Sequence, residues 1–138
     1  GELGEALWGA LYRPADFDAA RRYPVVEVIY GGPQLAAVPK GWEVNAAYVE
    51  QMAALGFVVV AIDGRGTPYR SREFHLAVHG RIQMCGDLPA HVQAIRSLAS
   101  SRPWMDLSRV GKLLISSAPA RLRSRLALAD SGRSSIIT

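Results

Sequence analysis

Tyr30 is the first side chain in this sequence whose type and position could do chemistry. It closes the apolar run that begins at Val25 and stands immediately before Gly31 and Gly32. A phenol at the end of a buried strand can donate a hydrogen bond to an oxyanion that develops during acyl transfer. A tyrosine at a strand end can also serve as a packing residue, and its type alone does not decide between the roles.

A second candidate is the turn Asp63-Gly64-Arg65-Gly66, which follows the apolar run 57–62. Loops at the carboxyl ends of buried strands are where α/β proteins bind ligands. The third glycine of a dinucleotide-binding GxGxxG turn is missing, and the residues 67–69 do not open a helix as that motif requires. We therefore expect no cofactor. Gly64 and Gly66 are interpreted as residues that supply positive φ for a sharp loop.

Metal and thiol chemistry find little support. His75 and His79 would share a helix face, but Leu76 stands where a zincin helix carries glutamate, and no third ligand is evident. We expect no metal site. Cys85 is the single cysteine, which excludes an internal disulfide and favours an inert thiol. His91 is expected at the polar edge of a later helix.

The elements that must position these residues follow from the apolar pattern. Strands are predicted at 5–13, 25–30, 57–62 and 110–115, and the third is apolar throughout, as in the middle of a parallel sheet. The order of strands and helices predicts an α/β chain on a mostly parallel sheet with flanking helices.

Two helices are predicted between the strands. The first spans 45–55, is capped by Asn45 and stopped by Gly56, and carries Tyr48, Met52 and Leu55 on one face. The second begins at Asp87, and its buried stripe comprises Val92, Ile95, Leu98 and Ala99. Residues 70–86 are ambiguous between a short helix and an irregular excursion.

Composition divides the chain near Gly111. Residues 112–138 contain five basic residues against Asp130 alone, which accounts for the whole net charge of +4, and they contain no aromatic residue. We predict one domain at 1–111 and a divergent, solvated or disordered basic tail at 112–138. Without interleaved aromatics or a recognisable binding fold, the tail does not indicate nucleic acid.

No apolar run approaches the roughly 20 residues of a membrane span. The sequence does not decide the compartment. Because it begins Gly-Glu-Leu, without an initiating Met, we expect an excerpt of a longer protein.

The strings VVEVIYGGP, FVVVAIDGRGTPYRSREF, AIRSLA and RPWMDLSRVG occur in this order, with fitting spacings, across residues 5–111. Together they resemble the prolyl oligopeptidase family, most closely its dipeptidyl peptidase IV-like branch. The resemblance implies part of an α/β-hydrolase fold, preceded in full-length members by a β-propeller that limits access to the active site. It also implies serine peptidase activity on short peptides, in many members after proline or alanine.

The residues carried over from the family are few. Tyr30 matches the family tyrosine whose hydroxyl helps to form the oxyanion hole. The turn Asp63 to Gly66 matches the family's DGRG turn, interpreted as a structural turn at the wall of the site with no triad role. The nucleophile does not match: after RVG the family continues into a GxSxGG elbow.

Ser116 falls at the offset expected for the nucleophile and is its positional candidate. Leu114 and Ala118, however, occupy the places of the two elbow glycines, so crowding by their side chains opposes a functional elbow. The triad acid and base have no counterpart in residues 117–138, where Asp130 is the only acid and histidine is absent. We therefore expect a fragment that is inactive alone. A shifted reading frame, a truncation and genuine divergence all remain open as explanations of the sequence after Gly111.

Three hypotheses remain. The first is an incomplete catalytic domain of a serine peptidase acting on peptides, which lacks the propeller and the C-terminal catalytic segments. The second is an esterase-like α/β-hydrolase that uses Ser116 with a base from a partner chain. The third is a non-catalytic remnant or interaction protein. A strand at 110–115 would form an exposed apolar edge, which predicts aggregation or a partner.

Overall fold

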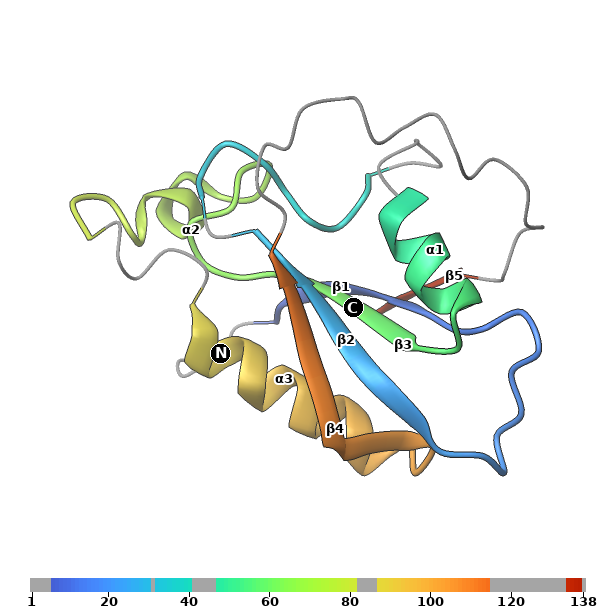
Figure 1. Ribbon diagram of the computed structural model, residues 1–138. Coiled ribbons are helices and arrows are strands. Elements are labelled where there is room, and N and C mark those ends of the chain that lie inside the picture. Colours follow the sequence, from blue (N-terminus) through green and yellow to red (C-terminus); the bar gives the residue numbers. More distant parts are fainter. Residues whose placement is uncertain (1–5, 31, 41–46, 82–86, 115–133, 138) are drawn as a thin grey trace.

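The computed structural model describes residues 6–30, 32–40, 47–81, 87–114 and 134–137. Within these ranges helices cover both faces of one five-stranded sheet (Figure 1). The elements are β1 (Trp8–Tyr12), β2 (Tyr23–Ile29), α1 (Ala47–Ala54), β3 (Val58–Asp63), α2 (Arg72–Leu76), α3 (Leu88–Ser100), β4 (Met105–Leu114) and β5 (Ser134–Ile137).

The sheet has the order β4-β2-β3-β1-β5 and is mixed. β2 runs parallel to both β3 and β4, so the apolar runs 25–30 and 57–62, each followed by glycines, form adjacent parallel strands. β1 runs antiparallel to β3 and to β5, which corrects the expectation of a mostly parallel sheet. The short connection 13–22 contains no crossover helix, so the chain reverses direction between β1 and β2, whereas helical segments separate β2 from β3 and β3 from β4.

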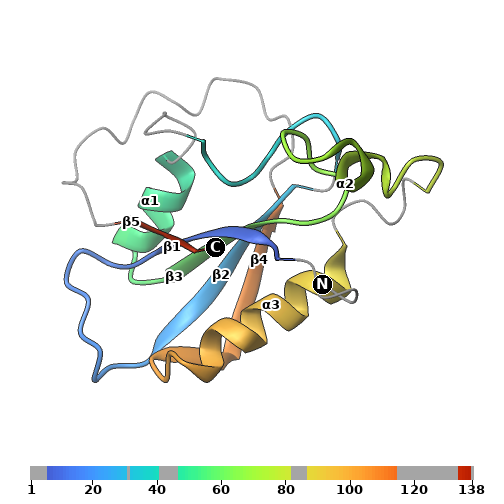
Figure 2. The ribbon, with the colours of Figure 1, turned by 180° about the vertical axis from the view of Figure 1, so that it is seen from behind.

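The core lies on both faces of β3, all six residues of which are buried, as the continuous apolar run predicted. On one face Val28, Val59 and Ala61 pack with Val49 and Ala53 of α1. On the other face the core comprises Val25, Val58, Val60, Ile62 and Ile95 of α3, and Figure 2 shows α3 along this side of the sheet. Two apolar layers therefore hold the central strands in place.

The first helix ends one residue earlier than predicted, and its buried face is only partly the predicted one. α1 begins at Ala47, and the expected cap Asn45 lies outside the described residues. Gly56 follows the helix with φ +91°, which confirms its role as the stop. Met52 packs against the core as predicted, whereas Leu55 lies beyond the last helical residue and is exposed. Val49 and Ala53 are the helix residues buried in the core.

The later helix also differs in which residues it buries. α3 starts directly after Asp87, as predicted, but His91 is buried and Val92 is exposed. Ile95 is buried, and Leu98 and Ala99 pack against the same cluster, as predicted. The buried face of α3 includes His91 instead of Val92, because the imidazole contacts the buried Glu27 carboxylate of β2.

The ambiguous segment after β3 contains α2, which Ser71 caps by accepting a hydrogen bond from the Phe74 N–H at 3.0 Å. α2 ends at Leu76, so His75 and His79 do not share a helix. Among the described residues no three His, Cys, Asp or Glu side chains gather as metal ligands. Cys85 lies outside the described residues.

The predicted tail contains parts of the sheet. β4 continues past Gly111 to Leu114, and β5 pairs with β1. Because 115–133 lie outside the description, the boundary between 1–111 and 112–138 stays a prediction. No helix among the described residues has the length and apolar character needed to cross a membrane.

β4 forms an edge of the described sheet, as expected for the strand predicted at 110–115, but it begins earlier, at Met105. Its side chains Leu107, Val110 and Leu113 are 41%, 47% and 36% exposed. Three residues, 107–109, bulge out where Asp106 pairs with Pro24 but Val110 pairs with Val25. The bulge interrupts the alternating pattern, which explains why the sequence did not reveal the first half of the strand.

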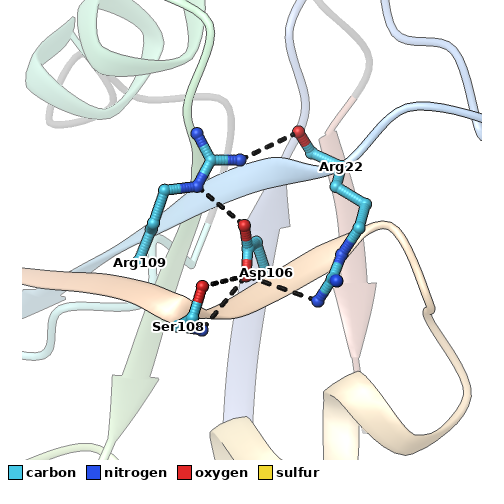
Figure 3. A network of polar contacts seen from close by, with 4 residues as sticks. All are labelled: Arg22, Asp106, Ser108 and Arg109. Atoms are coloured by element: carbon cyan, nitrogen blue, oxygen red, sulfur yellow. Dashed lines mark hydrogen bonds and ion pairs between the residues drawn. The ribbon is translucent and has the colours of Figure 1, made fainter.

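Asp106 organises this bulge (Figure 3). Its Oδ1 accepts hydrogen bonds from the Ser108 hydroxyl at 2.7 Å and the Ser108 N–H at 3.1 Å. Arg109 Nε donates to Oδ2 at 2.7 Å, and Arg22 Nη2 lies 3.3 Å from Oδ1. The Ser108 hydroxyl, followed by Arg109, lowers the pKa of Asp106 from 3.8 to about 2.

We expect acid to remove the stabilisation that Asp106 provides. Because the folded-state pKa is depressed, this contribution is present above the unfolded value near 3.8 and declines as pH falls toward about 2. The measurement is the free energy of unfolding against pH for the unchanged chain and for Asp106→Asn. The difference between the two should shrink between those pH values; a difference that stays constant would contradict the assignment.

Candidate active site

Tyr30 lies just beyond the end of β2, at the edge of the sheet where β3 also ends. Its side chain is half-buried, and its hydroxyl donates to Gln34 Oε1 at 3.1 Å. A Cβ on Gly32 would come within 2.5 Å of Gln34 Oε1 and 3.2 Å of the Tyr30 hydroxyl. Gly32 therefore leaves the space in which these two side chains meet. The oxyanion role of Tyr30 stays a prediction.

Asp63 has a larger structural role than the sequence indicated. It is completely buried, and its Oδ1 accepts hydrogen bonds from the Ala37 N–H at 2.7 Å and the Val38 N–H at 3.1 Å. Lys40 Nζ lies 3.9 Å from Oδ2. The carboxylate thus ties the end of β3 to the loop that follows Tyr30. The sequence feature that could have indicated this role is an acidic residue directly after the apolar run 57–62.

Gly66 is the conformationally special residue of the DGRG turn. It adopts φ +98°, as expected, whereas Gly64 is not among the described glycines with positive φ. The Gly64 carbonyl instead accepts the Thr67 N–H at 3.2 Å and the Thr67 hydroxyl at 2.9 Å. Gly64 therefore begins a hydrogen-bonded turn, and the first position of such a turn needs no left-handed backbone. The prediction that both glycines supply positive φ is confirmed for Gly66 and wrong for Gly64.

Two buried or half-buried contacts between an acidic and a basic side chain hold the start of α3 against the sheet. His91 Nδ1 contacts Glu27 Oε1 of β2, and both side chains are buried. One turn earlier, Asp87 Oδ2 lies 3.7 Å from Arg65 Nε of the DGRG turn. Asp87 adopts φ 41° and makes no side-chain cap, so its carboxylate faces Arg65 instead of the helix. Placing His91 at the polar edge of the helix was therefore wrong.

A third cluster borders this edge at the start of β1. Lys40 Nζ lies 3.9 Å and Arg70 Cζ 4.9 Å from the centre of the Trp8 ring. Arg70 also donates to the Ala6 carbonyl at 2.8 Å and lies over the Phe74 ring. Cation–π contacts of this kind hold the loops after β2 and β3 against β1.

The predicted nucleophile, Ser116, falls outside the described residues. β4, the strand that leads toward it, ends with Leu114 opposite Ile29, the residue before Tyr30. The structure therefore brings the end of β4 to the same edge as Tyr30, Asp63 and the DGRG turn.

Comparison with known sequences identifies this arrangement. The profile of the prolyl oligopeptidase family matches residues 42–113, which span β3, the DGRG turn, α3 and most of β4. The chain belongs to the prolyl oligopeptidase family. The resemblance carried by the YGGP and DGRG strings is thus confirmed, and this is a family of peptidases.

Individual relatives narrow the family further. Dipeptidyl peptidase 8 of Mus musculus is 37% identical over 109 residues, which cover 78% of this chain and 12% of that protein. An Emericella nidulans protein described as dipeptidyl-aminopeptidase B is 37% identical over 93 residues, or 67% of this chain and 9% of its own length. The chain thus spans only about a tenth of these family members.

A solved structure supports the same assignment. A crystal structure from Bacteroides ovatus, whose protein is described as a dipeptidyl aminopeptidase IV, superposes with a TM-score of 0.67 at 30% identity. The match covers 80% of this chain and 16% of that one. The mixed sheet with its flanking helices is therefore an arrangement found in this prolyl oligopeptidase branch.

Proposed function

We propose that this chain is part of the α/β-hydrolase catalytic domain of a serine peptidase of the dipeptidyl peptidase type, which acts on short peptides through an acyl-enzyme. The observation that carries the proposal is the pairing of Leu114 with Ile29 at the edge where Tyr30 stands. This supports the proposal because Tyr30 directly follows Ile29, whose partner Leu114 ends the strand that leads toward Ser116.

Tyr30 is assigned the role of oxyanion donor. In acyl transfer a serine oxygen attacks the peptide carbonyl, whose oxygen gains negative charge as the tetrahedral intermediate forms. A phenol held at a fixed place stabilises that charge without reorganising during the reaction. To act, the Tyr30 hydroxyl must redirect its proton from Gln34 Oε1 toward the substrate oxygen.

The 138-residue chain by itself is proposed to be inactive. Leu114 and Ala118 stand where the elbow of the family has glycines, and a serine without an adjacent base is a poor nucleophile at neutral pH. The exposed β4 edge fits this view, because apolar edge strands in α/β proteins are normally covered. We propose that further catalytic strands pair there in the complete enzyme, which also has the propeller implied by the resemblance.

The test of this function is a chimera in which residues 25–111 replace the matching segment of mouse dipeptidyl peptidase 8. We expect the chimera to release dipeptides, and Tyr30→Phe to lower kcat about 10²–10³-fold, with a small change in KM, as for the loss of one oxyanion donor. The measurement is steady-state hydrolysis of a chromogenic dipeptide substrate. A folded chimera whose kcat is unaffected by Tyr30→Phe would contradict the assignment.

The control for this experiment is the 138-residue chain itself, treated with a fluorophosphonate probe that labels activated serines. We expect no covalent adduct. Labelling at Ser116 would instead favour the esterase-like alternative, in which that serine is activated within this chain or by a partner chain.

A further inference from the structure

The loop 32–40 crosses the carboxyl edge of the sheet between Tyr30 and α1 (Figure 1). Its beginning contacts Tyr30 through Gln34, and its later part is bonded to Asp63 through two successive N–H groups. Val38 is buried in the core on the α1 face. The loop is therefore anchored at both ends, and one of the anchors is a buried carboxylate.

The Asp63 anchor consists of two backbone hydrogen bonds and two nearby cations. The Ala37 and Val38 N–H groups donate to the same oxygen, Oδ1. The cations that face the carboxylate are Lys40 from the loop and Arg70 from the segment after β3. Lys40 in turn lies over the Trp8 ring, so β1, β3 and the loop meet at this carboxylate.

We propose that Asp63 is a positioning residue for Tyr30: its buried carboxylate holds loop 32–40 across the sheet edge and thereby sets where the phenol hydroxyl stands. The inference rests on the proposed oxyanion role of Tyr30. The positioning itself is a property of this chain and can be measured without peptidase activity, so its failure is distinguishable from failure of the proposed function.

The experiment measures amide hydrogen exchange in the 138-residue chain and in Asp63→Ala. Loss of the acceptor should speed exchange of the Ala37 and Val38 amides by about ten-fold or more beyond any change in the middle of β3. Asp63→Asn keeps a carbonyl acceptor and should show a smaller change. Asp106→Ala, which removes another buried aspartate at the opposite edge of the sheet, is the matched control and should leave this loop protected.

The position of Tyr30 is monitored with 3-fluorotyrosine, and its ¹⁹F resonance is assigned with Tyr30→Phe. We expect this resonance to shift in Asp63→Ala and to remain in place in Asp106→Ala. The proposal is overturned if Ala37 and Val38 exchange at unchanged rates, if all core amides change in parallel, or if the loop is released while the Tyr30 resonance stays where it was.

A pH profile supplies a readout that the loss of packing alone would not change. Burial, outweighing the hydrogen bonds from Val38 and Ala37 and the two cations, raises the pKa of Asp63. The group therefore favours folding most below the ordinary value of 3.8, and that contribution declines as pH rises through the raised folded-state pKa. Asp63→Asn should remove this part of the pH dependence of unfolding; an unchanged profile would contradict the burial of the Asp63 carboxyl beneath loop 32–40.

Discussion

Replacing His91 by leucine is expected to lower the free energy of unfolding by about 3–5 kcal/mol, the cost of breaking a buried pair by removing one partner. Glu27 lies inside a sheet strand with 5% of its surface exposed, and the Nδ1 of His91 contacts its carboxylate. Without His91 the carboxylate would be deprived of that contact while still excluded from water. Because the free energy of unfolding of a domain is about 5–15 kcal/mol, such a loss would remove most of the stability of a marginally stable domain.

The double variant Glu27→Met with His91→Leu separates the contribution of the polar contact from that of simple packing. Removing both polar groups leaves apolar side chains of similar size between β2 and α3, and such replacements are often close to neutral. We expect the double variant to recover most of the stability lost in either single variant, measured by denaturant unfolding as a double-mutant cycle. His79→Leu, at an exposed histidine, is the control. Additive losses from the two single variants would contradict a coupled pair.

Replacing Gly66 by alanine is expected to lower the free energy of unfolding by about 2–5 kcal/mol, because two costs combine. Gly66 adopts φ +98°, a backbone conformation that residues with a side chain rarely adopt. A Cβ there would also lie 2.5 Å from Cγ2 of the buried Val78, a short and stiff side chain that cannot swing away. The measurement is the free energy of unfolding.

Gly56 provides a matched control for the strain term. It has φ +91°, but a Cβ there would meet nothing within 4 Å, so Gly56→Ala should cost only about 1–2 kcal/mol. In a chain that already carries Val78→Ala, the cost of Gly66→Ala should fall toward the same value, because the contact is relieved and the backbone strain remains. Equal costs for the two glycines in the unchanged chain would show that the contact with Val78 is unimportant.

The sequence alone determined the elements whose signal is local. The unbroken apolar run before Asp63 predicted a fully buried strand, since only a strand covered on both faces needs apolar residues at every position. Gly56 marked the end of α1 because only glycine adopts that backbone conformation cheaply. The YGGP and DGRG strings predicted the family, and they follow two strands that run parallel and end at the same edge of the sheet.

Tertiary structure decided the direction of β1, the start of β4 and the environment of His91. Alternation along β1 is the same for parallel and antiparallel pairing, so the direction depends on how the chain returns through 13–22. The β4 bulge depends on hydrogen bonds to Asp106, one from Ser108 within the strand and one from Arg22, 84 positions away in the sequence.

The buried pair shows the physical reason most clearly. Glu27 and His91 are 64 positions apart, and each alone is a polar residue that belongs at the surface. Only the packing of α3 on β2 brings them together, and the contact between them makes the burial of both side chains tolerable. The same holds for Asp63 and loop 32–40: the sequence placed the carboxylate at the end of its strand, but only the fold supplied the two N–H groups that it binds.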